Sequence, residues 1–191
     1  MPEHRRIDDA IFTVSGLFTR EECDEYIAFA EGIGFGEAPI TTFGGPVMMK
    51  DVRNNERVMV DDPGRAGVLW DRIRPHLGAM DFAGARAVGV NERLRFYRYD
   101  PGQVFRWHRD GYYQRPNGER SRLTYMVYLN EDFEGGETKF RDPDVVVKPE
   151  KGMALVFLHP LMHEGAAVSR GRKYVVRTDV MYGGGDGPYL D

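Results

Sequence analysis

Cysteine is almost absent from this chain of 191 residues, which contains only Cys23. A single cysteine cannot form an intramolecular disulfide, and it excludes a zinc site built from several thiolates. Long apolar runs are also lacking, so the sequence predicts no membrane-spanning segment. The first residues, MPEHRRIDDAIF, lack the apolar core of a secretory signal, and we therefore expect a cytoplasmic protein.

An excess of positive charge is missing as well. The chain has 26 Lys and Arg against 30 Asp and Glu, which gives a net charge of −4. A protein of this balance has no broad basic surface, so we expect neither nucleic acid nor a membrane as a partner. Hydrophobic residues make up 41% and charged residues 29%, which is typical of a globular chain. The length predicts a single domain over residues 1–191, and the sequence does not indicate an oligomeric state.

The first 90 residues read as a support region of helices and short strands. Thr19 and Glu22 form a capping box before an apolar pattern of helical spacing. Asp62 and Pro63 are a second helix start, and Pro75 should end or kink that helix near residue 74. Between the two predicted helices, Gly-Gly-Pro and Asn-Asn break up β-rich pieces, which indicates short strands and turns.

From about residue 91 the pattern changes to short β-type runs. The runs are RLRFYRY, RLTYMVYL, TKF, VVV, MALVFL and KYVVRTDVMY. Turn residues separate them, including Asn-Gly at 117–118 and Gly-Gly at 135–136. Many short strands at this spacing are typical of a sandwich or a barrel, so residues 91–182 form the predicted core. The segment 183–191 is rich in glycine and should be a loose tail, unless Tyr189 and Leu190 dock.

Three residues of this core could bind one metal ion. His108 and Asp110 stand two positions apart, so on a strand both point to the same face. Chance alone supplies roughly one such His-x-acid pair in a chain of this composition, so the pair is weak evidence by itself. His163 adds a second imidazole, and two histidines with one carboxylate leave three adjacent positions open on an octahedral ferrous ion. The alternative for each histidine is a hydrogen-bonded polar residue at a strand end.

A basic residue that could bind an anionic co-substrate follows His163 in the sequence. Lys173 lies ten positions later, and Lys173 and Arg177 share one face of a predicted strand. A cation on this face would pair with the far carboxylate of a dicarboxylic 2-oxo acid that chelates the iron at its other end. Lys173 is the first choice for this ion pair and Arg177 the second, while Arg172 should point the opposite way. A solvated surface charge is the alternative for Lys173 and Arg177.

The order of these motifs is specific. His-x-Asp comes first, Leu-Asn precedes a Gly-Gly-Glu-Thr turn, and a histidine is followed by a cation ten residues later. In this the chain resembles the iron(II)- and 2-oxoglutarate-dependent oxygenases, in their prolyl 4-hydroxylase-like branch, over residues 91–182. The resemblance implies an α+β fold with a mainly β core, a double-stranded β-helix (jelly roll) supported by N-terminal helices. It also implies hydroxylation of an unactivated C–H bond with release of succinate and CO₂.

The resemblance carries over to individual residues. His108, Asp110 and His163 match the ligands of Fe(II), and Lys173 matches the basic residue that pairs with 2-oxoglutarate. Tyr99 and Tyr128 match hydroxyls that line the pocket of this co-substrate, although Tyr128 is equally well explained as a core tyrosine. The implied cofactors are Fe(II), 2-oxoglutarate and O₂, with ascorbate as an optional addition. Because the carboxylate ligand is present, hydroxylation is favoured over halogenation.

Other residues and functions remain open. Arg95 and Tyr97 share a face with Tyr99, so they either line the substrate mouth or are solvated rim residues. Arg53 lies in a region that could form another side of the cleft or a solvated turn. The polar segment 111–121 could be a lid. The substrate, a peptidyl side chain or a small molecule, is not selected.

Three alternatives to an oxygenase can be named. A cupin-like metal-binding jelly roll would not turn over 2-oxoglutarate and would need no anchor for it, so Lys173 and Tyr128 argue against it. A zinc hydrolase would need a general base, and none lies at a recognisable spacing. An interaction domain with a degenerate site is not indicated, because all three candidate ligands are present.

Overall fold

Helix α1 (Arg20–Ile33) begins at the predicted capping box. Thr19 Oγ1 accepts a hydrogen bond from the backbone N–H of Glu22 at 3.2 Å, and Glu22 Oε2 accepts one from the N–H of Thr19 at 2.8 Å. The computed structural model describes residues 1–42, 45–78, 82 and 84–183, so the predicted tail beyond Gly183 lies outside the described residues. None of the helices within the described ranges is long and apolar enough to cross a membrane.

Helix α2 (Pro63–Ile73) also begins where the sequence predicts. The carboxylate of Asp62 accepts a hydrogen bond from the backbone N–H of Arg65 at 2.9 Å, which satisfies one free donor of the first turn. The helix ends one residue before a 3₁₀ turn (Arg74–His76) that contains the predicted breaker, Pro75. The proline ring cannot continue the α-helical hydrogen bonding, and this explains the change.

The larger of the two main sheets contains nine strands in the described part of the chain. In spatial order they are β1 (Glu3–Asp8), β2 (Ile11–Ser15), β14 (Ala154–Leu158), β10 (Arg120–Tyr128), β17 (Lys173–Gly183), β8 (Arg93–Tyr99), β6 (Glu56–Asp61) and β3 (Gly36–Glu37), with β7 (Arg86–Val90) paired to β17. Every pairing is antiparallel. N-terminal strands therefore extend the sheet that the C-terminal half builds.

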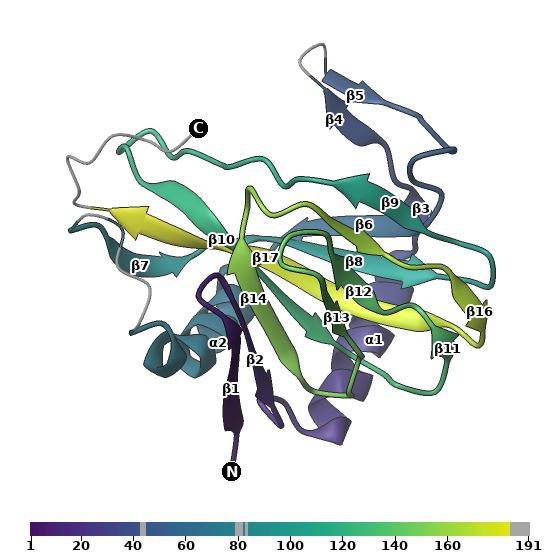
Figure 1. The fold of residues 1–191 in the computed structure, drawn as a ribbon, viewed down its shortest axis with the longest axis horizontal. Coiled ribbons are helices and arrows are strands. Elements are labelled where there is room, and N and C mark those ends of the chain that lie inside the picture. Colours follow the sequence, from purple (N-terminus) through teal and green to yellow (C-terminus); the bar gives the residue numbers. More distant parts are fainter. Residues whose placement is uncertain (43–44, 79–81, 83, 184–191) are drawn as a thin grey trace.

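A smaller sheet faces the middle of the larger one (Figure 1). Its order is β13 (Val145–Val147), β12 (Thr138–Phe140), β15 (His163–Gly165) and β9 (Phe105–His108). Two short pairs complete the structure, β11 (Glu134–Gly135) with β16 (Val168–Arg170) and β4 (Ile40–Thr42) with β5 (Gly45–Val47). Two facing antiparallel sheets with this strand order form the expected jelly roll.

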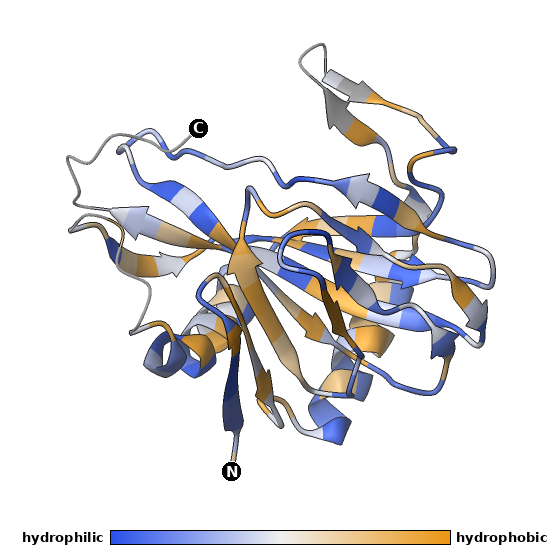
Figure 2. Ribbon diagram, in the orientation of Figure 1, coloured by the Kyte–Doolittle hydropathy of each residue, from blue (hydrophilic) through white to orange (hydrophobic). Residues whose placement is uncertain are grey.

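Strand β10 shows how the layers are held together. Leu123, Tyr125 and Val127 belong to the core between the larger sheet and the helices, which cover its far face in Figure 1. Met126 and Tyr128, at the alternate positions, belong to the core between the two sheets. The central strand β14 is apolar along its length in Figure 2, because both of its faces are covered. The fold thus has three layers, and the candidate ligands lie between the two sheets.

Candidate metal centre and the cavities beside it

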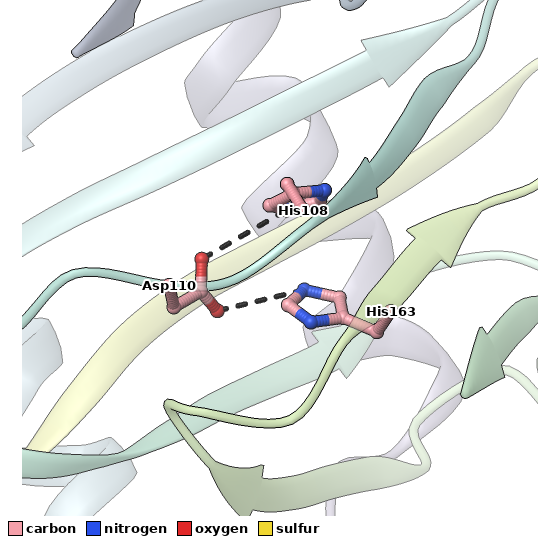
Figure 3. A group of neighbouring side chains, drawn as sticks. All are labelled: His108, Asp110 and His163. Atoms are coloured by element: carbon pink, nitrogen blue, oxygen red, sulfur yellow. Dashed lines mark ion pairs between the residues drawn. The ribbon is translucent and has the colours of Figure 1, made fainter. Parts of the chain in front are cut away.

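The three candidate ligands meet at one point between the sheets. His108 ends β9, His163 begins β15, and the two residues are direct partners across the antiparallel pair. Asp110 follows β9 by two residues and points toward both imidazoles (Figure 3). The Nε2 atoms of His108 and His163 lie 3.9 Å and 3.6 Å from the carboxylate oxygens of Asp110. All three ligand atoms lie within 4.8 Å of one another, close enough for a single ion.

Both histidines direct the Nε2 atom of the imidazole ring toward the candidate metal site. The Nδ1 atom of His108 lies 2.7 Å from the carbonyl oxygen of Arg106, and that of His163 lies 2.9 Å from the carbonyl oxygen of Leu161. A carbonyl only accepts, so Nδ1–H is the donor and each Nε2 keeps its lone pair for a ligand. Burial, with a smaller contribution from His163, lowers the pKa of His108 to about 3. Burial lowers the pKa of His163 as well, so both rings are neutral near pH 7.

A buried arginine holds Asp110 in its ionised form. Burial raises the pKa of Asp110, but the guanidinium of Arg177 and the two candidate histidine ligands outweigh it, and the pKa lies well below its usual range. Arg177 Nη1 donates to Asp110 Oδ1 at 2.7 Å, and Nη2 donates to Asp179 Oδ1 at 3.0 Å. Arg95 donates to the other oxygen of Asp179 at 3.0 Å. The four side chains form an alternating row of charge beside the site.

A chain of hydroxyls and imidazole fixes the second oxygen of Asp110. Thr124 Oγ1 donates to Asp110 Oδ2 at 2.5 Å, and Oγ1 lies 3.0 Å from His159 Nδ1. Because the threonine proton is used on the carboxylate, His159 Nδ1–H donates to Thr124, and Ser121 Oγ donates to His159 Nε2 at 2.9 Å. Both ring nitrogens of His159 are used in these contacts, so His159 supports a candidate ligand and is not a ligand itself. Sequence reasoning missed Thr124, which shares the inward face of β10 with Tyr128.

An inner cavity runs from the candidate ligands to Lys173. The three ligands, Tyr99, Thr138 and Lys173 are among the residues that line it. Lys173 is 2% exposed, and its Nζ donates to the carbonyl oxygen of Gly136 at 2.6 Å. Burial lowers the pKa of this amine to about 7. In the part of the chain that the structure describes, no carboxylate lies within ion-pair distance of Lys173.

The two tyrosines named from the resemblance flank this lysine. Lys173 Nζ lies 5.1 Å from the ring centre of Tyr99 and 5.4 Å from that of Tyr128. Tyr128 is fully buried and does not line the cavity, but its hydroxyl lies 2.7 Å from the hydroxyl of Thr138, which does. Gly136 has φ +68°, and a Cβ there would come within 3.2 Å of the Lys173 side chain. Only glycine allows the carbonyl this close approach to the amine without strain.

A wider outer cleft opens on the other side of the candidate ligands. Arg53, Arg57, Arg95 and Tyr97 line it together with Tyr112. The structure thus resolves the alternatives for Arg95 and Tyr97, which line the cleft. Tyr97, Phe105, His108, Asp110 and Arg177 line both cavities, so the candidate metal centre lies between them.

The residues beside the His-x-Asp pair and the segment 111–121 can also be placed relative to the metal centre. Trp107 is 36% exposed and Arg172 pairs with Asp100 at the surface, so both point away from the centre as expected. Alternation from His108 and Asp110 predicts that Arg109 points away from the centre too, but Arg109 lines the outer cleft. Arg115 ties segment 111–121 to the body through an ion pair with Glu92 at 2.6 Å, and a second ion pair, with Glu119 at 2.5 Å, lies within the segment.

The donor set suits a ferrous ion. Two neutral imidazoles offer free Nε2 atoms, and an ionised carboxylate offers one oxygen, from three backbone positions around one point. Mixed nitrogen and oxygen donors of this kind, with open positions remaining, are the ligands of non-haem Fe(II). The inner cavity adds one buried amine without a carboxylate partner, which fits the distant carboxylate of a 2-oxo acid. The described residues therefore fit both groups.

Comparisons with known proteins agree with this geometry. The family model described as the 2OG-Fe(II) oxygenase superfamily matches residues 94–178, which include all three candidate ligands. A protein of Acanthamoeba polyphaga mimivirus named as a prolyl 4-hydroxylase is 26% identical, over 90% of this chain and 75% of its own length. An Arabidopsis thaliana protein named as prolyl 4-hydroxylase 4 is 25% identical, and the match covers 85% of this chain and 64% of that protein. The chain thus spans just under two thirds of this plant relative.

Solved structures give the same picture. The collagen prolyl hydroxylase of Paramecium Bursaria Chlorella virus-1, determined as a complex with 2OG, superposes with a TM-score of 0.66 at 26% identity. That match covers 90% of this chain and 96% of the viral one. A prolyl hydroxylase of Trichoplax adhaerens, in complex with a hypoxia inducible factor peptide fragment, superposes with a TM-score of 0.71 over 90% of this chain and 83% of its own. Its identity is 14%, so this second likeness concerns the fold alone.

Proposed function

Because the chain belongs to the 2OG-Fe(II) oxygenase superfamily, in its prolyl 4-hydroxylase-like branch, we propose that it hydroxylates a prolyl side chain in a peptide. It is a 2-oxoglutarate-dependent dioxygenase, and the names of its relatives motivate the prolyl substrate. The observation that carries the proposal is the meeting of His108, Asp110 and His163 at one end of a cavity whose other end is Lys173.

Each candidate residue has a role that follows from its contacts. His108, Asp110 and His163 would hold Fe(II), and Lys173 would pair with the distal carboxylate of 2-oxoglutarate. When bound, the ferrous ion and its co-substrate use O₂ to insert one oxygen atom into a C–H bond and release succinate and CO₂. Lys173 donates to a carbonyl in the present structure, and a carboxylate would give it a stronger, charge-assisted partner.

The remaining residues position these groups. Arg177 and Thr124 each donate to one oxygen of Asp110 and so fix the plane of its carboxylate. Tyr128 forms a hydrogen bond with the hydroxyl of Thr138 and would hold this cavity-lining residue in place beside the co-substrate. Arg177, the second choice as the co-substrate anchor, is engaged by two buried carboxylates, so we assign it to Asp110 and leave the anchor to Lys173.

The first test is spectroscopic. Fe(II) and 2-oxoglutarate added together under anaerobic conditions should give a weak visible charge-transfer band, and Lys173→Met should require far more 2-oxoglutarate to produce it. Absence of the band in folded, fully metallated protein would overturn the assignment. The cupin-like alternative predicts metal binding without this band.

The second test identifies the product. Proline-containing peptides incubated with the loaded enzyme, 2-oxoglutarate and O₂ should gain one oxygen atom by mass spectrometry, at proline. A gain at another side chain would retain the oxygenase and overturn the choice of proline. Ascorbate as an auxiliary reductant is a separate proposal, supported by the family alone, and its omission from this assay should lower the number of turnovers. A cytoplasmic location stays a prediction.

A further inference from the structure

The walls of the outer cleft carry a strong imbalance of charge. Among the residues that line it, five are arginines and one is a carboxylate. The arginines are Arg53, Arg57, Arg95, Arg109 and Arg177, and the carboxylate is Asp110. Asp110 is itself a candidate ligand, so its charge is committed to the metal centre when the ion is bound. The outer cleft, which adjoins the candidate metal centre, is therefore electropositive.

Among the described residues, three of these arginines have no anionic partner, and two of the three, Arg53 and Arg57, are withdrawn from solvent, whereas Arg109 is exposed. Arg95 and Arg177 pair with Asp179 and Asp110, as described above. Arg57 is half-buried, and in the described part of the chain no side chain or backbone acceptor forms a hydrogen bond with its guanidinium. Arg53 is 4% exposed, donates from Nε only to the neutral amide oxygen of Asn55, and has no partner for Nη2 among the described residues.

The local electrostatics report the same imbalance. Burial raises the pKa of Tyr97, yet Arg177, Arg53 and Arg95 outweigh burial, and the pKa of this phenol falls below its ordinary value. Burial lowers the pKa of Arg57, and the neighbouring guanidinium groups lower it further. The lowered pKa of the Tyr97 phenol and the lowered pKa of the Arg57 guanidinium both indicate a surplus of positive charge in this cleft.

The co-substrate does not account for this surplus. Lys173, at the far end of the inner cavity, is the cation that fits the distal carboxylate of 2-oxoglutarate, and Lys173 does not line the outer cleft. Arg53 and Arg57 line the outer cleft and do not line the inner cavity. An anion bound by Arg53 and Arg57 would therefore lie outside the inner cavity that fits the co-substrate.

A substrate carboxylate would complete this arrangement. A buried donor without an acceptor costs free energy, and a guanidinium recovers it best from a carboxylate, which can accept two parallel hydrogen bonds. Arg53 is already held rigid, since its guanidinium stacks 4.7 Å from the ring centre of Tyr97 and 4.4 Å from that of Phe105. Less side-chain entropy is then lost when a ligand binds.

We propose that the substrate carries a carboxylate that binds Arg57 and Arg53 in the outer cleft while the target C–H bond faces the metal centre. The proposal rests on the oxygenase function given above and narrows its substrate to an acidic peptide, with Asp or Glu close to the hydroxylated residue. A small carboxylic acid shares this chemistry, and the test separates the two sources.

Binding without turnover tests the proposal. The protein with Fe(II) and 2-oxoglutarate, kept under argon, is titrated into two fluorescein-labelled heptapeptides, Gly-Ser-Glu-Pro-Glu-Ser-Gly and its counterpart with glutamine for both glutamates. Fluorescence anisotropy should give at least tenfold tighter binding of the glutamate peptide, which corresponds to about 1.4 kcal/mol. N-acetylglutamate and N-acetylglutamine are compared in parallel by calorimetry. A preference seen only with N-acetylglutamate assigns the carboxylate to a small acid.

Variants test whether the preference for the glutamate probe arises in the outer cleft. Arg57→Gln should reduce the preference for the glutamate probe to less than threefold, whereas Arg57→Lys, which keeps the charge, should retain most of it. Arg170→Gln removes an exposed arginine outside the cleft and should leave the preference unchanged. Equal binding of both members in both probe pairs, including no binding of either, overturns the proposal. So does a preference that Arg57→Gln leaves intact in a folded variant.

Failure of the proposed function and failure of the substrate carboxylate give different results. The anaerobic visible band reports on Fe(II) and 2-oxoglutarate alone, and its loss would overturn the proposed function. A normal band with no preference for carboxylate probes would overturn only the present inference.

Discussion

Replacing Arg177 with methionine should expose how the metal centre is held together. Arg177 is 12% exposed as a side chain and bonds Asp110 at 2.7 Å and Asp179 at 3.0 Å. Removing one partner of a buried ion pair costs roughly 3–5 kcal/mol, because a buried charge is left behind. Asp179 keeps Arg95 and Asp110 keeps Thr124, so the loss should lie near the lower end, about 3 kcal/mol.

The same substitution should change how protons compete with the metal. The charge of Arg177 contributes to lowering the pKa of Asp110, His108 and His163 alike. Without it the pKa of each candidate ligand rises, so protons occupy the ligand atoms at higher pH. As pH falls, binding of Co(II) should then weaken at a higher pH in Arg177→Met than in the parent protein.

Chemical unfolding of the metal-free protein at pH 7.5 and visible absorption of bound Co(II) measure the two effects. Arg95→Met is the matched control, since Arg95 bonds Asp179 but does not contact Asp110. It should lose stability without changing the pH profile of metal binding. If Arg177→Met costs less than about 1 kcal/mol and leaves the pH profile of metal binding the same as in the parent protein, Arg177 does not hold the ionised carboxylate.

Three further outcomes are expected. Asp110→Ala should reduce succinate formation at least a hundredfold, and a variant that kept full turnover would remove Asp110 from the ligand set. Binding of 2-oxoglutarate at pH 8 should take up a proton, because the pKa of Lys173 is lowered to about 7 without the co-substrate and a carboxylate partner raises this pKa. Calorimetry in Tris and in HEPES measures the proton uptake. Lys173→Met should abolish it. The metal-free protein should lose stability between pH 6.5 and 4 by about 1.4 kcal/mol per unit for each neutral buried histidine, since His108 and His159 have pKa values of about 3 and 4 when folded and protonate earlier when unfolded. Urea unfolding midpoints that stay constant across that range would contradict the last prediction.

Strands and helices with strong local signals could be read directly from the sequence. The run RLRFYRY is β8 without a shift at either end, and TKF and VVV are β12 and β13. Thr19 and Asp62 begin the two helices because capping is a local interaction, decided within four residues. Local chemistry fixed these elements, and tertiary packing did not override it.

The pairing of β1 and β2 with the C-terminal half could not be read in this way. Strand β2 pairs with β14, roughly 140 residues away along the chain, and the residues of β2 alone do not indicate which strand it pairs with. The same limit applies to Thr124, whose role depends on Asp110 arriving from a different segment. Alternation along β10 could have indicated that Thr124 faces inward, but not what it meets there.

Lys173 and Arg177 show most clearly where sequence reasoning stops. A period of two places both cations on the inward face of β17, so alternation cannot choose between them as the anchor of the co-substrate. Their partners make the choice, and those come from elsewhere in the chain. Arg177 faces two buried carboxylates, while Lys173, which lines the inner cavity, has the carbonyl of Gly136 as its one hydrogen-bond partner among the described residues. A cation whose charge is already balanced gains little from a further anion, whereas a buried amine without a carboxylate gains a great deal. That difference favours Lys173 for 2-oxoglutarate, and the same criterion, applied to the outer cleft, selects Arg57 and Arg53 for the substrate.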